Sequence, residues 1–285
     1  MIPLYVSRHL EYLRLRGLAD GTIDARRRAL TRMIPALPRP LLYSTPADLL
    51  AWRAALQIGP EAIRTYVSHA HQFYAWAVSA GLLTRNPADA LPVPRKTRRL
   101  PRPISERDLM AVLATAPARI RIWLVLAAWV GLRAKEIALL RVESIAISAK
   151  PPFVLIEVDA TKGRSERIVP LSAFAVAEIV SANLPEHGYA FGRLDGQGGP
   201  NGPWTVSKVC NRYLHECGVS ATLHQLRHRF GTQAYRYRRD LRAVQELLGH
   251  RSPATTAVYA DYDRAEATAA VQSIPTPTAG DQIAS

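Results

Sequence analysis

Residues 224–259 are HQLRHRFGTQAYRYRRDLRAVQELLGHRSPATTAVY, and this stretch decides how the rest of the chain is interpreted. The HQLRHRF segment has a helical pattern that places His224, Arg227 and His228 on one side, at spacings i, i+3 and i+4. A zinc site of the metalloprotease kind does not fit, because no Glu follows His224 and the guanidinium of Arg227 would repel a cation. An anion is therefore the better ligand for this cluster.

The same stretch ends with LGHRSPATTAVY. Gly249 can end a helix in the left-handed conformation, His250 follows it directly, and Tyr259 lies nine residues after His250. A lone tyrosine among apolar residues usually belongs to a core. By itself, this segment leaves open whether Tyr259 packs or reacts.

Upstream, the sequence predicts helices that lead to a second charged pair. Ser105 with Asp108 three residues later resembles a capping box, and an apolar helix and then a longer one follow. The segment GLRAKEIALL comes next, with Arg133 just after the apolar helix and Glu136 on the same helical face. Taken alone, this spacing is that of an ordinary surface ion pair.

A β-hairpin is predicted after this pair. FVLIEV (153–158) and RIVPL (167–171) have strand composition, and the polar TKGRSE between them contains Gly163 for the turn. Lys162 lies in this turn, where its ammonium would either reach a substrate or simply be solvated.

Composition indicates an acidic partner. The 285 residues suffice for two ordinary domains, and the formal charge of +14 with a pI near 10.3 is typical of proteins that bind a polyanion, with nucleic acid the first expectation. Two cysteines support neither a disulfide framework nor a four-ligand zinc site. Without a membrane span or a signal-peptide pattern, we expect a soluble, cytoplasmic protein.

The chain divides into four segments by pattern. Residues 1–88 are expected to be helical, 89–103 a basic Pro-rich linker, 104–274 a second domain and 275–285 a flexible C-terminal tail. The linker holds four prolines and five basic residues against one acid, which favours a segment lying along a phosphate backbone over a plain connector. The predicted DNA-binding residues of the linker are Arg95, Lys96, Arg98 and Arg99.

Together and in this order, the motifs resemble a known pattern. The order is Arg, then Lys on a β-hairpin, then His-x-x-Arg, then His, then Tyr. This order resembles the catalytic domain of tyrosine recombinases, the family of phage integrases, the Xer proteins and Cre. Residues 104–270 match this pattern, and the basic helical first half resembles the family's SAM-like core-binding domain. The resemblance implies a mainly α protein, with a helical bundle followed by a mainly α catalytic domain that holds a small antiparallel β-sheet.

Carried over residue by residue, the resemblance implies a six-residue catalytic set and an accessory glutamate. Lys135 stands where Xer-like sequences often have Ser, a departure outside that set. An arm-type DNA-binding domain is missing, so the expected relative is a simple integrase. The catalytic residues are Arg133, Lys162, His224, Arg227, His250 and Tyr259, and the accessory residue is Glu136.

The implied chemistry forms a 3′-phosphotyrosine bond to DNA without metal, ATP or another cofactor. Tyr259 is the nucleophile and His224 its candidate proton acceptor. Arg133 and Arg227 would hydrogen-bond the non-bridging oxygens, whose charge grows in the transition state. Lys162 would protonate the departing 5′ oxygen. The remaining member, His250, is expected to hydrogen-bond a phosphate oxygen.

The expected function is site-specific recombination in phage or prophage integration and excision. The expected partners are double-stranded DNA, three further copies of the chain in a homotetramer on synapsed sites, and possible host or phage directionality factors, with no membrane. Residues 265–274 are the candidate segment for docking on a neighbouring copy. Alternatives are a Xer-like chromosome or plasmid dimer resolvase, a type IB topoisomerase, and a non-catalytic DNA-binding regulator on the same fold.

Overall fold

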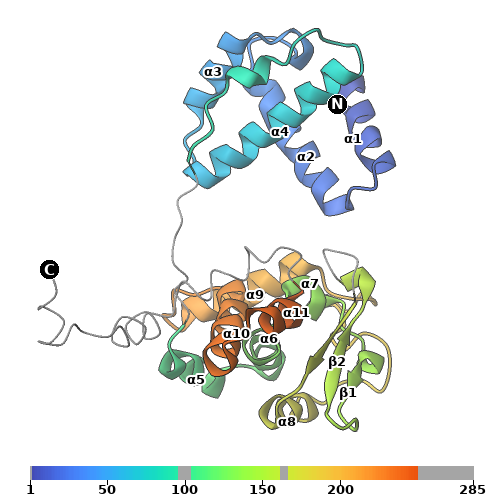
Figure 1. Cartoon of the computed structure of the whole chain (residues 1–285), viewed down its shortest axis with the longest axis vertical. Helices are drawn as coiled ribbons and strands as arrows, with labels where there is room; N and C mark the ends of the chain where they lie inside the picture. The colour runs from blue at the N-terminus through green and yellow to red at the C-terminus, as the bar shows by residue number, and fades with distance from the viewer. Residues whose placement is uncertain (1, 96–103, 161–165, 250–285) are drawn as a thin grey trace, which may run out of the picture. The chain divides into compact units, whose positions relative to one another are not determined.

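The computed structural model describes residues 2–95, 104–160 and 166–249 and divides into two compact units (Figure 1). Unit 1 comprises residues 1–98 and unit 2 residues 99–285, so the division falls inside the segment 89–103. The predicted fold class, mainly α with a small antiparallel sheet, is confirmed.

Unit 1 is a helical bundle, and prolines mark the starts of two of its helices. Pro46 and Pro60 occupy the first positions of two helices, where the missing N–H costs nothing, and Thr45 caps the first of these. Leu30, Phe73 and other apolar residues form the core. The helices are α1 (Leu4–Leu15), α2 (Asp20–Met33), α3 (Pro46–Ala55) and α4 (Pro60–Ser79), with 3-10 turns at Ile34–Ala36, Leu41–Tyr43 and Pro87–Ala90.

The chain continues along unit 1 after α4. Leu91 is buried in the unit 1 core. Arg53 Nε donates to the carbonyl of Pro92 at 3.2 Å, and Arg64 Nη2 donates to that of Pro94 at 2.6 Å. The first residues of the basic segment are therefore held on unit 1 by side chains of α3 and α4.

Unit 1 also buries a polar cluster. Arg26 is 3% exposed and donates to Gln72 Oε1 at 2.5 Å. Its neighbours include His9, whose ring packs edge-on to Phe73 at 5.4 Å. Desolvation, followed by the positive charge of Arg26, lowers the pKa of both His9 and His69 to about 4. Both imidazoles are therefore neutral near pH 7.

Unit 2 is built around one apolar helix, α6. Helices α8, α9 and α10 pack on it (Figure 1), and for this reason α6 is apolar on nearly all sides. Ser105 Oγ accepts from the Asp108 amide at 3.0 Å and caps α5, as predicted. The helices are α5 (Glu106–Thr115), α6 (Ala118–Trp129), α7 (Ala134–Ala138), α8 (Ala173–Ser181), α9 (Pro203–Glu216), α10 (Leu223–Arg238) and α11 (Leu241–Leu248), with 3-10 turns at Val142–Ser144 and Val158–Ala160.

A three-stranded antiparallel sheet in the order β1-β2-β3 completes unit 2. The predicted hairpin is present as β2 (Phe153–Ile156) and β3 (Arg167–Pro170), with Val154 opposite Val169. The edge position of β3 suits Pro170, which has no N–H to give to a further strand. Strand β1 (Ile145–Ala146) was not predicted, because two residues carry no readable alternation.

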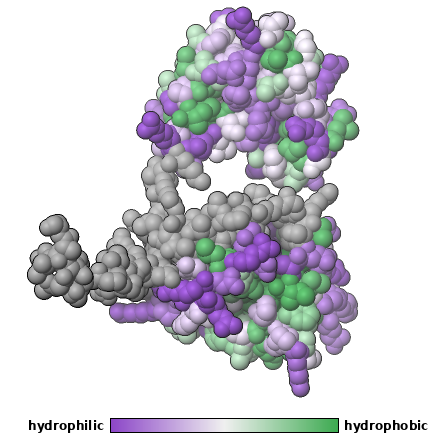
Figure 2. All heavy atoms as spheres, viewed as in Figure 1, coloured by the Kyte–Doolittle hydropathy of each residue, from purple (hydrophilic) through white to green (hydrophobic). Residues whose placement is uncertain are grey.

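In the described part of the chain, no helix is long and apolar enough to span a membrane. On the face shown in Figure 2, hydrophilic and hydrophobic side chains are interspersed over both units.

Candidate active site

The centre of the candidate site is the carboxylate of Glu136. After α6, Gly131 adopts a positive φ of 72°, and α7 then begins behind Arg133. The Arg133 amide donates to Glu136 Oε2 at 2.8 Å, which holds the carboxylate at the helix N-terminus. The Glu136 side chain is 0% exposed. The surface ion pair suggested by the sequence spacing is therefore wrong, because α7 turns Glu136 into the interior.

Three arginines from distant parts of unit 2 surround this carboxylate. Arg133 Nη1 donates to Oε1 at 2.7 Å, and Arg227 Nη1 lies 3.5 Å from Oε2. Arg167 donates with both terminal nitrogens, at 2.9 Å to Oε1 and 2.7 Å to Oε2. Burial alone would raise the pKa of Glu136, but the bonds and charges of Arg167, the charge of Arg227 and the Arg133 amide lower it to about 2. The carboxylate is therefore ionised and holds the guanidiniums in place.

The same three arginines bind the C-terminal end of α11. Arg167 Nε donates to the carbonyl of Leu247 at 2.8 Å, and Arg133 Nη2 donates to that of Gly249 at 3.2 Å. Arg227 donates to the carbonyl between them, that of Leu248. Gly249 has φ 60° and ψ 49°, so the prediction that it ends a helix in the left-handed conformation is confirmed. The carbonyls that a helix end leaves without intrahelical partners are satisfied by guanidiniums here.

Helix α10 supplies the histidines of the candidate site. His224 and His228 contact each other, with ring centroids 4.5 Å apart, on the helix that carries Arg227. Desolvation lowers the pKa of His224, and the positive charges of Arg227 and Arg133 lower it further. The pKa of His228 falls to about 4, from desolvation first and then from His224 and Arg227. His224 therefore lies within electrostatic range of both predicted catalytic arginines and favours the neutral form.

The described residues include only part of the predicted catalytic set. Arg133 and Arg227 come together on Glu136, although more than 90 residues separate them in the chain, and His224 lies within electrostatic range of both. Arg95 is exposed at the end of the described part of unit 1. Other predicted site residues lie outside the described ranges: Lys96, Arg98, Arg99, Lys162, His250 and Tyr259.

Sequence reasoning missed Arg167. It was assigned only as the first residue of a strand, and its partners lie 31 and 80 positions away in the chain. No local spacing could reveal those contacts. Only the structure shows that the Arg167 side chain is 8% exposed and therefore needs a buried acid as its partner.

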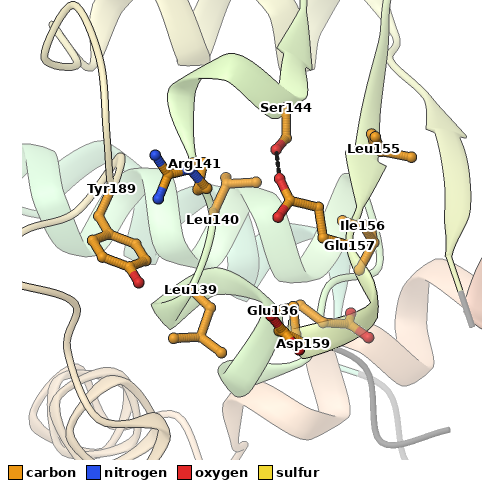
Figure 3. Close-up of a pocket in the computed structure, with 11 residues that line it drawn as sticks. Glu136, Leu139, Leu140, Arg141, Ser144, Leu155, Ile156, Glu157, Asp159 and Tyr189 are labelled. Carbon is orange, nitrogen blue, oxygen red and sulfur yellow. Dashed lines mark hydrogen bonds between the residues drawn. The ribbon is translucent and has the colours of Figure 1, made fainter. Parts of the chain in front are cut away.

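A small cavity lies next to this cluster, beside the sheet (Figure 3). Its volume is about 180 Å³, and Glu136, Glu157 and Asp159 contribute to its lining. Ser144 Oγ donates to Glu157 across one wall, as the dashed line in Figure 3 shows. No group of three or more His, Cys, Asp or Glu side chains within the described ranges is arranged to hold a metal ion.

Comparison with known proteins identifies the family. Residues 103–266 match the model of the phage integrase family, which is more than half of the chain. The chain belongs to the phage integrase family. It is a tyrosine recombinase, a member of a family of enzymes that cleave and rejoin DNA. The predicted resemblance and enzyme class are confirmed.

Curated relatives of this tyrosine recombinase align over most of its length. It is 30% identical to tyrosine recombinase XerC of Xylella fastidiosa, with 87% of this chain and 88% of the relative aligned. It is 28% identical to XerD of Pseudomonas aeruginosa, over 91% and 93% of the two chains. A lambda integrase tetramer bound to a Holliday junction has the same fold, with a TM-score of 0.73, 18% identity and coverage of 90% of this chain and 76% of that one.

Proposed function

We propose that this tyrosine recombinase is a site-specific integrase that joins to DNA through Tyr259, in phage or prophage integration and excision. The observation that carries the proposal is the arginine cluster on Glu136, because its carboxylate holds Arg133 by a hydrogen bond of 2.7 Å and Arg227 by an ion pair of 3.5 Å. Arg133 is 25% exposed and can reach an anion outside the cluster. Preorganised donors of this kind stabilise charge that develops in a transition state.

In the proposed cleavage, the Tyr259 oxygen attacks phosphorus, forms the 3′-phosphotyrosine bond and displaces the 5′ oxygen. The Tyr259 proton passes to His224, whose lowered pKa keeps a nitrogen lone pair available. Lys162 gives a proton to the departing 5′ oxygen. Arg133 and Arg227 stabilise the negative charge on the non-bridging oxygens, each by an amount on the scale of one oxyanion donor, about 3 kcal/mol.

Rejoining is the same reaction in reverse. A free 5′ hydroxyl attacks the phosphotyrosine, gives its proton to Lys162 and displaces Tyr259, which recovers a proton from His224. His250 hydrogen-bonds a phosphate oxygen in both directions. Because the ester preserves the energy of the broken bond, neither step needs an external energy source.

The proposed assembly is a homotetramer on two synapsed double-stranded DNA sites. A lambda integrase of the same fold is a tetramer on a Holliday junction, and XerH is seen bound to its difH substrate. Host or phage directionality factors would then select integration or excision. The linker residues Arg95, Lys96, Arg98 and Arg99 are proposed to lie along the DNA backbone.

The test is to incubate the protein with its own flanking genomic DNA and to map any covalently trapped strand. We expect an adduct at the ends of the genomic element that carries the gene, joined through Tyr259. Tyr259→Phe removes one hydroxyl and no phosphate contact, so it should bind DNA normally and form no adduct. An adduct formed by the Phe variant would overturn the assignment of the nucleophile.

A Xer-like resolvase is the second candidate, favoured by the alignment over about nine tenths of XerD. The same mapping separates the two functions. An adduct at one chromosomal site unrelated to a mobile element indicates dimer resolution. Specific binding without any adduct would indicate a non-catalytic regulator.

A further inference from the structure

Arg167 uses all three of its guanidinium nitrogens inside unit 2. Nη1 and Nη2 bind the two oxygens of Glu136 in a fork, at 2.9 and 2.7 Å, and Nε binds the carbonyl of Leu247 at 2.8 Å. The side chain is 8% exposed. Because its guanidinium nitrogens already bind these groups, the role of Arg167 follows from the groups that it holds.

Those groups belong to two parts of the proposed active site. Glu136 is the carboxylate that also holds Arg133 and Arg227. Leu247 lies in the last turn of α11, and the chain runs from this helix end to His250 and Tyr259. Arg167 itself follows Lys162 by five residues. Arg167, the first residue of β3, thus joins that strand to the buried carboxylate and to the end of α11.

We propose that Arg167 is a positioning residue that fixes the C-terminal end of α11 on Glu136, and thereby the point from which the chain continues to Tyr259. The inference rests on the proposed function, because it gives Arg167 a role through the nucleophile assigned there. The two bonds to Glu136 and the bond to Leu247 favour one orientation of the helix end. In a different orientation, the planar guanidinium could not make all three bonds at once. A lysine keeps the charge but cannot make this set of bonds.

Gly249 gives a second way to disturb the same contact. A Cβ at Gly249 would lie 3.1 Å from Arg167 Nη1 and 3.2 Å from its Cδ, so an alanine there must displace Arg167. Gly218 has a similar φ, 74° against 60°, but a Cβ there would meet nothing within 4 Å. Gly218→Ala therefore reproduces the backbone strain of Gly249→Ala without touching Arg167.

Unit 2 also contains a matched control for Arg167. Arg121 binds both oxygens of Glu178 through Nε and Nη2, at 2.7 and 2.5 Å, and donates through Nη1 to the carbonyl of Leu113 at 2.6 Å. Like Arg167 it thus makes two bonds to one carboxylate and one to a backbone carbonyl, although its side chain is 33% exposed. This cluster joins α5, α6 and α8 and includes none of the proposed site residues. Arg121→Lys therefore removes the same kinds of bond as Arg167→Lys and measures the purely structural effect.

The experiment compares the two lysine variants and the two alanine variants with the wild type. Hydrogen exchange is measured on peptides covering residues 241–249, and single-turnover adduct formation is measured at saturating DNA on the site mapped for the wild type. We expect Arg167→Lys and Gly249→Ala to speed exchange at the end of α11 and to slow adduct formation by about tenfold or more, with DNA affinity within about twofold. Arg121→Lys and Gly218→Ala should leave both measurements near the wild-type values.

Equal adduct rates in Arg167→Lys and Arg121→Lys would overturn the inference, as would equal rates in Gly249→Ala and Gly218→Ala. If Arg167→Lys does not fold, the alanine pair decides alone. If the wild type forms no adduct, the proposed function fails instead, and hydrogen exchange still decides whether Arg167 holds the helix end.

Discussion

At the residue scale, Glu136 is the group on which most of the site depends. Its carboxylate is fully buried and compensates three guanidiniums, so its removal leaves several positive charges without a counter-charge in the interior. A buried ion pair adds little net stability compared with apolar packing, but loss of one partner is costly. We infer that Glu136 has a greater effect on stability than its accessory role in the family pattern suggests.

We predict that Glu136→Gln, which keeps the shape but not the charge, lowers the unfolding free energy of unit 2 by about 3–5 kcal/mol at pH 7. Denaturant unfolding followed by circular dichroism measures the loss. Glu178→Gln is the control, because among the described residues Glu178 pairs with one guanidinium, that of Arg121, and not with three. A Glu136→Gln loss no larger than that of the control would contradict the central role of this carboxylate.

At the element scale, the basic segment that begins after α4 is the part of the chain that we propose lies along the DNA backbone. Its start is held on unit 1, where Arg53 and Arg64 bind the carbonyls of Pro92 and Pro94. Arg95 follows at once and is exposed. An anchored start limits the conformations open to the basic residues that follow and lowers the entropy lost on binding.

We predict that changing Arg95, Lys96, Arg98 and Arg99 together to Gln weakens specific and non-specific DNA binding alike. The log-log slope of affinity against salt should flatten by about 3–4 units, since each phosphate contact contributes about 0.9. Arg193→Gln with Arg212→Gln serves as control, because these arginines are paired with Asp195 and Glu216. An unchanged salt slope would make the segment a connector only.

Elements with local signals were predictable from sequence, and those defined by distant contacts were not. Helix α4 begins at a proline and keeps an apolar face over 20 residues, so its pattern sufficed. The Gly249 helix end is equally local. Strand β1 exists only through pairing with β2, and the burial of Glu136 depends on Arg167 and Arg227, far along the chain. Sequence therefore indicated Glu136, Arg133 and Arg227, but neither Arg167 nor the fact that one carboxylate holds all three arginines.

At the scale of the whole molecule, both units hold histidines that respond to acid, and unit 2 holds a buried carboxylate as well. In unit 1 the pKa values of His9 and His69 fall from 6.5 to about 4 on folding, so the folded state binds fewer protons. In unit 2 the pKa of His228 falls to about 4 in the same way. The contribution of these histidines to stability is complete above pH 6.5 and is lost as the pH falls toward 4. The pKa of Glu136 falls from 4.5 to about 2, so its contribution in unit 2 is lost only below pH 4.5.

We predict that both units lose stability on acidification between pH 6.5 and 4, with an effect on the order of 2–3 kcal/mol for each of His9, His69 and His228. Unit 2 should lose further stability between pH 4.5 and 2, because Glu136 is protonated there. Hydrogen exchange of peptides from α4 and α6 at a series of pH values reports on each unit separately. Exchange in either helix that does not change between pH 6.5 and 4 would show that these histidines do not control the acid response of that unit.

The proposed tetramer gives a further prediction at this scale. Truncation after Arg264 removes residues 265–285, including the proposed docking segment 265–274, and retains every proposed catalytic residue. The truncated protein should bind one DNA site normally but fail to bring two sites together, which native gel electrophoresis separates. Full recombination by the truncated protein would reject the docking role.

The close approach of Gly249 to Arg167 also constrains how the sequence can change over evolution. A side chain at position 249 would need both a left-handed backbone and space now filled by a guanidinium. A shorter residue can replace Arg167 only if position 136 no longer carries a carboxylate that two donors must bind. Substitutions at 136, 167 and 249 should therefore be accepted together and rejected singly, so that these positions covary among homologous recombinases although they lie far apart in the chain.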